Sequence, residues 1–237
     1  AVSSPRQQAS SANVEAPVAL PGAGWALFTD RTAGNLSTGA GEGRELGLER
    51  RAELCERVGL RWLCSSRQTH GTNVNTIERV SARAGQALAI DADGHATTLA
   101  GVGAMVMAAD CLPVALGATG VVAIVHAGWR GLAAGVLEQG VASLRKLGDG
   151  EPLEAIVGPC AGVCCYAVGA EVHAAFGGAH RVGRHIDLRA IAHERLAAAG
   201  VGRVRDVQAC TVCDERFFSH RREGERAGRQ AGVAWLS

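Results

Sequence analysis

Three short segments of the sequence each end an apolar stretch in a side chain that can bind a metal ion: His70 in "SSRQTHG", Cys111 in "MAADCLP" and His126 in "IVHAGWRG". Strand ends beside tight turns are rigid, and glycines allow close backbone approach, so these side chains can be aimed at one point. Two imidazoles and one thiolate would leave the fourth position of a tetrahedral Zn²⁺ open, which is typical of catalytic zinc sites. The pattern predicts a metal centre held by these residues.

Each of the three signals has a structural alternative when it is taken alone. A histidine after a strand often serves as a hydrogen-bonded structural residue, and a cysteine in an apolar strand is commonly a small hydrophobe. The glycines of "AIVHAGWRG" could serve only the turn. Asp110 and Arg130 flank two of the candidate ligands, and either could orient a ligand or substrate or form a structural ion pair. The coincidence of three such signals favours the metal hypothesis.

Other motifs in the chain lead to weaker hypotheses. "CTVC" at Cys210 and Cys213, together with Cys160, Cys164 and Cys165, could form a structural four-thiolate zinc site, although the spacing is irregular. "GVGAMVMA" resembles a dinucleotide glycine pattern but precedes its strand instead of leading into a helix. The H-x-E and P-C-x-x-C signature of zinc deaminases is absent.

The charge balance argues against nucleic acid as a partner. The chain has 24 Lys and Arg against 23 Asp and Glu, so it carries no overall field that would hold a polyanion. The exception is a basic cluster interrupted by two glutamates, which we expect to be a solvated face able to hold one phosphate: Arg221, Arg222, Arg226 and Arg229. A small ligand is therefore the expected partner. We also expect the protein to be a monomer or a small homo-oligomer.

Composition and segment lengths predict a protein of the reducing cytoplasm. The most apolar stretch, residues 112–127, is interrupted by Pro113, several glycines and His126, so it cannot supply the ~20 apolar residues of a membrane span. No signal-peptide pattern is found, and the Ser- and Pro-rich residues 1–22 are expected to form a poorly ordered tail. Eight cysteines would then be thiols or metal ligands and not a disulfide framework.

The hydrophobic periodicity predicts one catalytic domain over residues 23–237, with an α/β or α+β sandwich architecture. Helices are expected at residues 45–60, 131–148, 169–177 and 187–201. Strands are expected at residues 24–31, on both sides of a turn at His70–Gly71, and at 153–159, 204–209 and 232–236. The apolar runs 104–110, 113–118 and 121–127 are expected to be neighbouring buried strands of one sheet.

Several blocks of the sequence resemble the YfiH family, also called polyphenol oxidase or laccase-domain proteins. They include "QTHG", "AADCLPV", "VVAIVHAGWRGLAAGV", "VGPCAGVCCYAVG" and "GRQAGVAWL", and the resemblance runs from about Trp25 to the C-terminus. It implies an α-β-β-α sandwich with mixed sheets, related to the fold of bacterial toxin deamidases. At His70, Cys111 and His126 it implies ligands of a catalytic zinc. The chain departs from the family at Ala167, where glutamate is common.

The resemblance also implies a substrate class. The substrates would be purine nucleosides. The main reaction would be phosphorolysis of adenosine, inosine or methylthioadenosine to the free base and a ribose 1-phosphate, and adenosine deamination would be a second activity. A cysteine hydrolase or amidase acting on cell-wall precursors, with Cys111 as nucleophile and His126 as base, is a separate hypothesis. A copper-dependent polyphenol oxidase is another, but the eight histidines include no His-x-His pair; Cu²⁺ could still occupy the site in vitro. A non-catalytic binding module is the last alternative.

Overall fold

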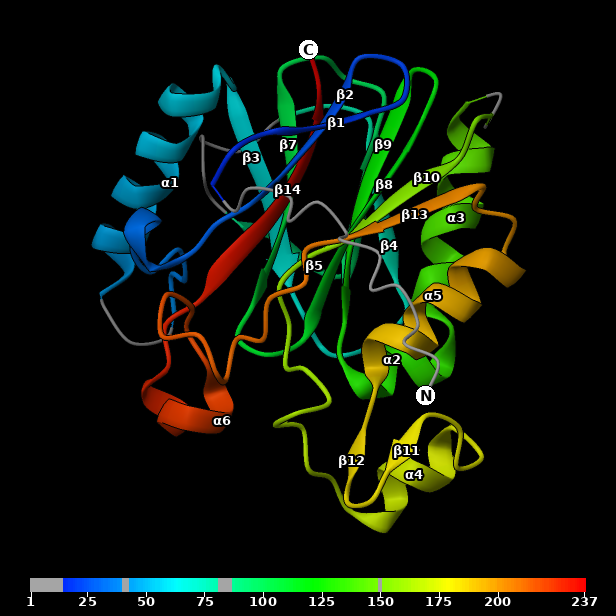
Figure 1. The fold of residues 1–237 in the computed structure, drawn as a ribbon. Coiled ribbons are helices and arrows are strands. Elements are labelled where there is room, and N and C mark those ends of the chain that lie inside the picture. Colours follow the sequence, from blue (N-terminus) through cyan, green and yellow to red (C-terminus); the bar gives the residue numbers. More distant parts are fainter. Residues whose placement is uncertain (1–14, 40–42, 81–86, 149–150) are drawn as a thin grey trace, which may run out of the picture.

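Two six-stranded sheets pack face to face in the computed structural model, which describes residues 15–39, 43–80, 87–148 and 151–237 (Figure 1). The first sheet has the order β1 (Val18–Leu20), β2 (Gly24–Phe28), β14 (Gln230–Leu236), β7 (Val102–Ala108), β3 (Trp62–Arg67) and β5 (Ala87–Asp91). The second has the order β13 (Arg203–Asp206), β10 (Glu154–Val157), β8 (Leu112–Ala118), β9 (Val121–Ala127), β6 (Gly94–Thr97) and β4 (Val74–Ile77). Both sheets are mixed, so the α+β sandwich expected from the sequence is confirmed.

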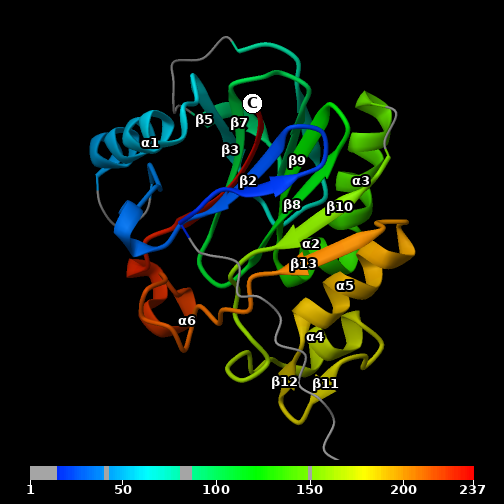
Figure 2. The same ribbon diagram turned by 45° about the horizontal axis from the view of Figure 1, so that its top comes forward.

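Helices cover the outer face of each sheet, as the two views of the ribbon show (Figures 1 and 2). Helix α1 (Arg44–Val58) lies on the first sheet, where Leu54 packs against Leu63 and Met105. Helices α3 (Val136–Leu147) and α5 (Leu188–Ala198) lie on the second sheet. The remaining elements are short: α2 (Trp129–Ala134), α4 (Ala170–Ala175), α6 (His220–Glu223), two 3-10 turns (Arg31–Ala33 and Gly224–Arg226) and a ribbon of β11 (Arg181–Val182) with β12 (His185–Ile186).

Alternating side chains divide the interior into three apolar layers. In β7, Val106 faces the second sheet while Met105 faces α1. In β9, Ile124 faces the first sheet while Val125 faces α3. This period of two buries both faces of the central strands, which explains why their sequences are continuously apolar.

The prediction that residues 104–110, 113–118 and 121–127 share one sheet is wrong. Strand β7 pairs with β14 and β3 in the first sheet, whereas β8 and β9 form a hairpin in the second. They are neighbours only because the sheets pack against each other. Likewise, the strands on the two sides of His70, β3 and β4, lie in different sheets. A continuous apolar run shows that a strand is buried on both faces but not which partner strand it pairs with.

Two boundaries also differ from expectation. The helix predicted over residues 131–148 is two helices, α2 and α3, which are separated at Gly135 because that residue has φ +100°. Of the tail expected at residues 1–22, residues 1–14 lie outside the described part of the chain, and Val18–Leu20 forms β1 against β2. Ordered structure therefore begins before residue 23.

Candidate active site

The three predicted ligands lie where the chain crosses from one sheet to the other. His70 follows β3 of the first sheet, in the connection that leads to β4 of the second. Cys111 lies in the short connection from β7 to β8, and His126 lies next to the last residue of β9. Because Leu112 is paired with Ala127 in the β8–β9 hairpin, Cys111 and His126 reach the same sheet edge. The topology thus brings all three to one point.

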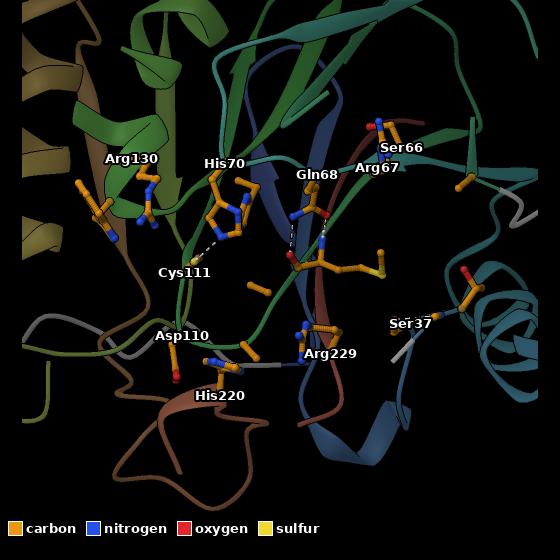
Figure 3. Close-up of a pocket in the computed structure, with 18 of the residues that line it drawn as sticks. Ser37, Ser66, Arg67, Gln68, His70, Asp110, Cys111, Arg130, His220 and Arg229 are labelled. Carbon is orange, nitrogen blue, oxygen red and sulfur yellow. Dashed lines mark hydrogen bonds between the residues drawn. The ribbon is translucent and has the colours of Figure 1, made fainter. Parts of the chain in front are cut away.

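The three side chains offer ligand atoms that all lie within 4.8 Å of one another. The Cys111 Sγ is 3.9 Å from His70 Nε2 (Figure 3). The rings of His70 and His126 meet edge to face, with their centroids 4.9 Å apart. His126 is buried, Cys111 is half-buried and His70 is exposed. The cluster is therefore anchored in the protein on one side and open on the other.

Asp93, which the sequence analysis missed, organises this cluster. Its buried carboxylate accepts a hydrogen bond at 2.8 Å from His126 Nδ1, which leaves the Nε2 atom of His126 available as a ligand. The same carboxylate accepts the backbone N–H groups of Thr69, His70 and Gly71 at 2.8–3.0 Å. One side chain therefore orients one histidine and fixes the loop that carries the other.

The electrostatics of the cluster favour an ionised ligand set. Burial opposes the charge of Asp93, but its hydrogen bonds with His126, Gly71 and Thr69 lower the pKa of Asp93 to about 2. Burial likewise opposes the thiolate of Cys111, but the neighbouring His126 and His70 lower the pKa of Cys111 to about 6. Burial lowers the pKa of His126, but this effect is outweighed by the charges of Cys111 and Asp93 and by the hydrogen bonds of His126 to both. Together they raise the pKa of His126 to about 9. In the absence of a metal, these opposite shifts favour a thiolate at Cys111 and an imidazolium at His126.

Two glycines of "HAGWRG" leave space for the cluster. A Cβ atom on Gly128 would lie 2.6 Å from His70 Cδ2 and 3.2 Å from Cys111 Sγ. A Cβ atom on Gly131 would lie 2.7 Å from the carbonyl oxygen of Gly71. Gly128 has φ −68°, which any residue can adopt, so space and not the turn requires glycine there.

Strained backbone marks the two loops that carry His70 and Cys111. His70 has φ +60° and Asp110, next to Cys111, has φ +89°, a region that residues other than glycine adopt at a cost of about 1–3 kcal/mol. At His70 the strain is held by the Asp93 hydrogen bond to its backbone N–H. Gln68 adds support, since its side-chain amide bonds both the N–H and the carbonyl of Met107 in β7.

Asp110 holds loops together through hydrogen bonds. Its carboxylate accepts from Thr211 Oγ1 at 2.6 Å, from Ser219 Oγ at 3.1 Å and from the backbone N–H of Arg221 at 2.6 Å. The C-terminal loop is thereby fastened beside Cys111. Arg130, in contrast, lies over the ring of Trp129 with its guanidinium carbon 4.3 Å from the ring centroid, beside the opening of the cluster (Figure 3).

A cavity of about 710 Å³ opens onto the three ligands. Its wall includes the two aromatic side chains Trp129 and Tyr166 and five basic or polar groups: Gln68, Arg130, His220, Arg221 and Arg229. The volume lies within the range of small-molecule sites, which is about 300–1,000 Å³. The arrangement offers flat apolar surface for a ring system, positive charge for an anion, and an open metal-capable cluster.

The basic segment near the C-terminus is divided between this cavity and the structure around it. Arg221 lies over the Tyr166 ring at 5.1 Å and, like Arg229, lines the cavity. Arg222 instead donates to the carbonyl oxygens of Thr211, Val212 and Phe217 and pairs with Glu223. Arg221, Arg222 and Arg226 are exposed, as expected for a solvated face, whereas Arg229 is half-buried. In addition, Arg221 and Arg229 face the cavity.

Comparison with known proteins places these features in a family context. Residues 28–237 match the sequence model of a family described as multi-copper polyphenol oxidoreductase laccase. A purine nucleoside phosphorylase of Xylella fastidiosa is 39% identical over 236 residues, covering 91% of this chain and 88% of the relative. Adenosine deaminase RL5, from an unknown prokaryotic organism, is 34% identical over 212 residues. The match covers 77% of this chain and 79% of the relative.

Solved structures share the fold over almost the whole chain. Protein NMB0706 of Neisseria meningitidis superposes with a TM-score of 0.79 at 30% identity, covering 94% of this chain and 98% of the other. A YfiH protein of Bacillus licheniformis superposes with a TM-score of 0.80 at 24% identity and covers 90% and 93%, respectively, so it supports the fold alone. Within the described residues, no helix has the length and apolar character needed to cross a membrane.

Proposed function

This chain belongs to the multi-copper polyphenol oxidoreductase laccase family, and we propose that it is a zinc-dependent purine nucleoside enzyme. Its main reaction would be phosphorolysis of adenosine, inosine or methylthioadenosine, and it would also deaminate adenosine. The observation that carries the proposal is the open cluster of His70, Cys111 and His126 in the wall of a cavity with aromatic and basic sides. The phosphorylase and deaminase names of the relatives support the substrate class.

The donor set fits zinc on structural grounds. Nδ1 of His126 is committed to Asp93, so its Nε2 is the ligand atom, and Gly128 leaves open the space that a side chain would fill. Two imidazoles and a thiolate suit Zn²⁺ and leave one position free. When bound in such a site, zinc acts as a Lewis acid and lowers the pKa of a coordinated water to about 7.

The residues of the cavity suit the two parts of a phosphorolysis reaction. A phosphate oxygen forms a bond to C1′ of the ribose while the bond from C1′ to the purine nitrogen breaks, and the departing base takes up a proton. Arg130 and Arg221 can hold the phosphate by charge-assisted hydrogen bonds. Tyr166 and Trp129 provide surfaces on which the purine can stack. In deamination, water replaces the amino group at C6 and ammonia leaves.

The test is product analysis of purified protein with adenosine or inosine, with and without phosphate. Phosphorolysis predicts free base and ribose 1-phosphate only when phosphate is present, with sulfate as the matched anion control. Deamination predicts inosine from adenosine in either buffer. If neither free base nor inosine forms with zinc-loaded protein, the proposal fails.

A cysteine hydrolase remains a second candidate because the pKa of Cys111 is lowered to about 6 beside His126. Such a thiolate could attack an amide without a metal. The two proposals differ in their response to chelation. A nucleoside enzyme of the kind proposed loses activity with its metal and regains it with Zn²⁺, whereas a thiol hydrolase would be active without metal and inactivated by alkylation.

Copper oxidation is less well supported by the geometry. Among the described residues, the one metal-capable cluster that contains histidine has only two of them, whereas a multicopper centre needs many. Copper exceeds zinc in intrinsic affinity for such ligands, so copper-loaded protein is not informative. Metal analysis of protein produced without added copper is the decisive measurement, and we expect zinc.

A further inference from the structure

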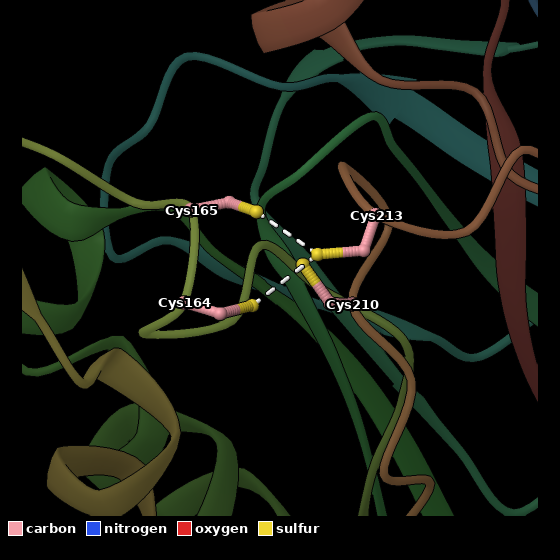
Figure 4. Close-up of side chains that lie close together, drawn as sticks. All are labelled: Cys164, Cys165, Cys210 and Cys213. Carbon is pink, nitrogen blue, oxygen red and sulfur yellow. Dashed lines mark hydrogen bonds between the residues drawn. The ribbon is translucent and has the colours of Figure 1, made fainter.

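Four cysteines form a second cluster outside the cavity. Cys164 and Cys165 come from the loop between β10 and α4, and Cys210 and Cys213 come from the loop between β13 and α6. Their four Sγ atoms all lie within 4.8 Å of one another, and Figure 4 shows the side chains of the two loops converging. Cys164 and Cys213 are exposed and the other two are half-buried, so the cluster lies at the surface.

The backbone holds these two loops side by side without help from the thiols. The N–H of Cys160 donates to the carbonyl oxygen of Ala209, and the N–H of Thr211 donates to that of Cys160 at 3.0 Å. Each loop then turns tightly: Cys165 N–H bonds Gly162 O at 2.9 Å, and Asp214 N–H bonds Cys210 O at 3.0 Å. The site is thus built by ordinary backbone pairing, and its geometry is preorganised.

The four sulfurs lie close enough together for a tetrahedral metal to bind after small side-chain shifts. With Zn–S bonds of ~2.3 Å, the sulfurs of a tetrahedral site lie about 3.8 Å apart. Cys213 Sγ lies 3.4 Å from Cys164 Sγ and 2.9 Å from Cys165 Sγ. These distances exceed the ~2.05 Å of a disulfide. Small shifts of exposed side chains would bring all four sulfurs to the tetrahedral spacing.

The surroundings of Cys210 suit a thiolate ligand. The backbone N–H of Gly162 donates to Cys210 Sγ at 3.2 Å, and hydrogen bonds to coordinated sulfur are a common way in which proteins tune thiolate sites. A Cβ atom on Gly162 would lie 3.3 Å from Cys164 Sγ and 3.4 Å from Cys210 Sγ, so glycine keeps the space clear. The fifth cysteine of the region, Cys160, is buried and faces Arg189, so it lies outside the set.

We propose that Cys164, Cys165, Cys210 and Cys213 bind a second Zn²⁺ in a closed, four-thiolate site. Binding displaces the thiol protons to solvent and leaves four Zn–S bonds, with no change of oxidation state. Four protein ligands leave no open position, so this zinc is structural.

The second zinc would act by tying together two walls of the cavity. Tyr166, which follows Cys165, lies in the cavity wall, and its ring packs against Arg221. Thr211, which follows Cys210, donates its hydroxyl to Asp110 beside Cys111. A bond network through zinc therefore connects the loop of Tyr166 to the loop that fastens Asp110. The cluster is expected to position these side chains without touching a substrate.

The test is native mass spectrometry of protein dialysed against Zn²⁺ and then against metal-free buffer. Wild-type protein is expected to retain two zinc ions per chain. Cys213→Ser and His126→Ala are each expected to retain one, and the double variant none. Cys55→Ala, a buried cysteine in α1 far from both clusters in sequence, is the control and should retain two. Because each cluster has its own variant, failure of the second site is distinguishable from failure of the first.

X-ray absorption of the His126→Ala protein gives an independent readout that does not require a cysteine variant to fold. Its single zinc should have four sulfur neighbours at ~2.3 Å. One zinc in wild-type protein that is lost in His126→Ala and kept in Cys213→Ser would overturn the proposal. A Cys165–Cys213 disulfide in freshly purified protein, detected by peptide mass spectrometry, would overturn it as well.

Discussion

Two clusters of metal-capable side chains in this chain lie on different kinds of scaffold. His70, Cys111 and His126 stand at the ends of core strands, are braced by the buried Asp93, and open into a cavity. The four cysteines stand on two surface loops. Three ligands on rigid elements suit a catalytic metal that keeps one coordination position free. Four ligands on loops suit a structural metal that holds together segments with little apolar packing of their own. The number of ligands and the rigidity of their support therefore distinguish a catalytic site from a structural one.

The largest expected difference between the clusters is in catalysis. His126→Ala should reduce nucleoside turnover to background because it removes a ligand and leaves Asp93 without its partner. Cys213→Ser should retain measurable turnover, since its cluster touches no substrate. Steady-state assays at saturating Zn²⁺ make the comparison, with His185→Ala in β12 as a control that should behave like wild type. Full turnover in His126→Ala would remove the basis for a catalytic metal.

Asp93→Asn tests the bracing of the first cluster. An amide cannot hold the His126 Nδ1–H as a carboxylate does, and loss of such an outer partner typically lowers metal affinity 10–100-fold. We expect that loss for one of the two zinc ions in competition titrations with a chelator. Asp91→Asn is the matched control, because Asp91 is exposed and pairs with Arg67. Equal affinities for the two variants would contradict the bracing role.

Substitution of the glycine beside each cluster should weaken zinc binding to different degrees. The added methyl of Gly128→Ala would lie 2.6 Å from the His70 ring, so one zinc should bind about tenfold more weakly or be lost, by analogy with disturbed outer partners. In Gly162→Ala the nearest contact is 3.2 Å, and small shifts of loop side chains can relieve it. Metal analysis measures the zinc that each variant retains. Full retention by both variants would mean that the first cluster accommodates an added methyl group as easily as the second. Gly43→Ala, which meets nothing within 4 Å, is the control.

Some of this organisation was predictable from the sequence and some was not. The three candidate ligands could be selected because strand ends and turns leave a local pattern of apolar residues, glycine and proline. Asp93 was missed because it follows β5, whose residues are mostly exposed and give no apolar signal. The available clue was the position of Asp93 directly before Gly94, the first residue of β6, because His70 is likewise followed directly by a glycine.

Assignment of strands to sheets was beyond the local pattern. Strands β7, β8 and β9 are equally apolar, and their division between two sheets depends on pairing with β14, which lies more than a hundred residues away. The cysteine cluster raised the same difficulty. The sequence offered five cysteines for a thiolate site, but their irregular spacing could not select four of them. The two pairs are brought together by the backbone bonds between the segments of Cys160 and Ala209, not by a short motif.

The rate at which Cys111 is alkylated should depend on pH differently from the rates of cysteines buried in the core. Because the pKa of Cys111 is lowered to about 6 by His126 and His70, against burial, its thiolate is present at neutral pH and is lost as the pH falls through about 6. In metal-free protein, alkylation of Cys111 should therefore be nearly constant above pH ~7 and fall below pH ~6. Cys64, whose pKa burial raises to about 11, should react little in that range. Peptide mass spectrometry gives both rates, and a midpoint near the usual thiol value for Cys111 would show that no thiolate–imidazolium pair forms.

The smallest expected effect concerns the fold itself. The first cluster lies at the ends of strands that are already buried among apolar side chains, so chelated protein should keep its circular dichroism spectrum. Zinc at a hundredfold excess over its dissociation constant would still add about 2.7 kcal/mol of apparent stability. Hydrogen exchange should quicken mainly in the loops at residues 158–168 and 207–219, and Cys213→Ser should reproduce that change without chelator. Collapse of the spectrum when the Cys213→Ser protein, which should hold zinc at the first cluster alone, is chelated would mean that this metal holds the sheets together. The three-ligand cluster would then have to be regarded as structural.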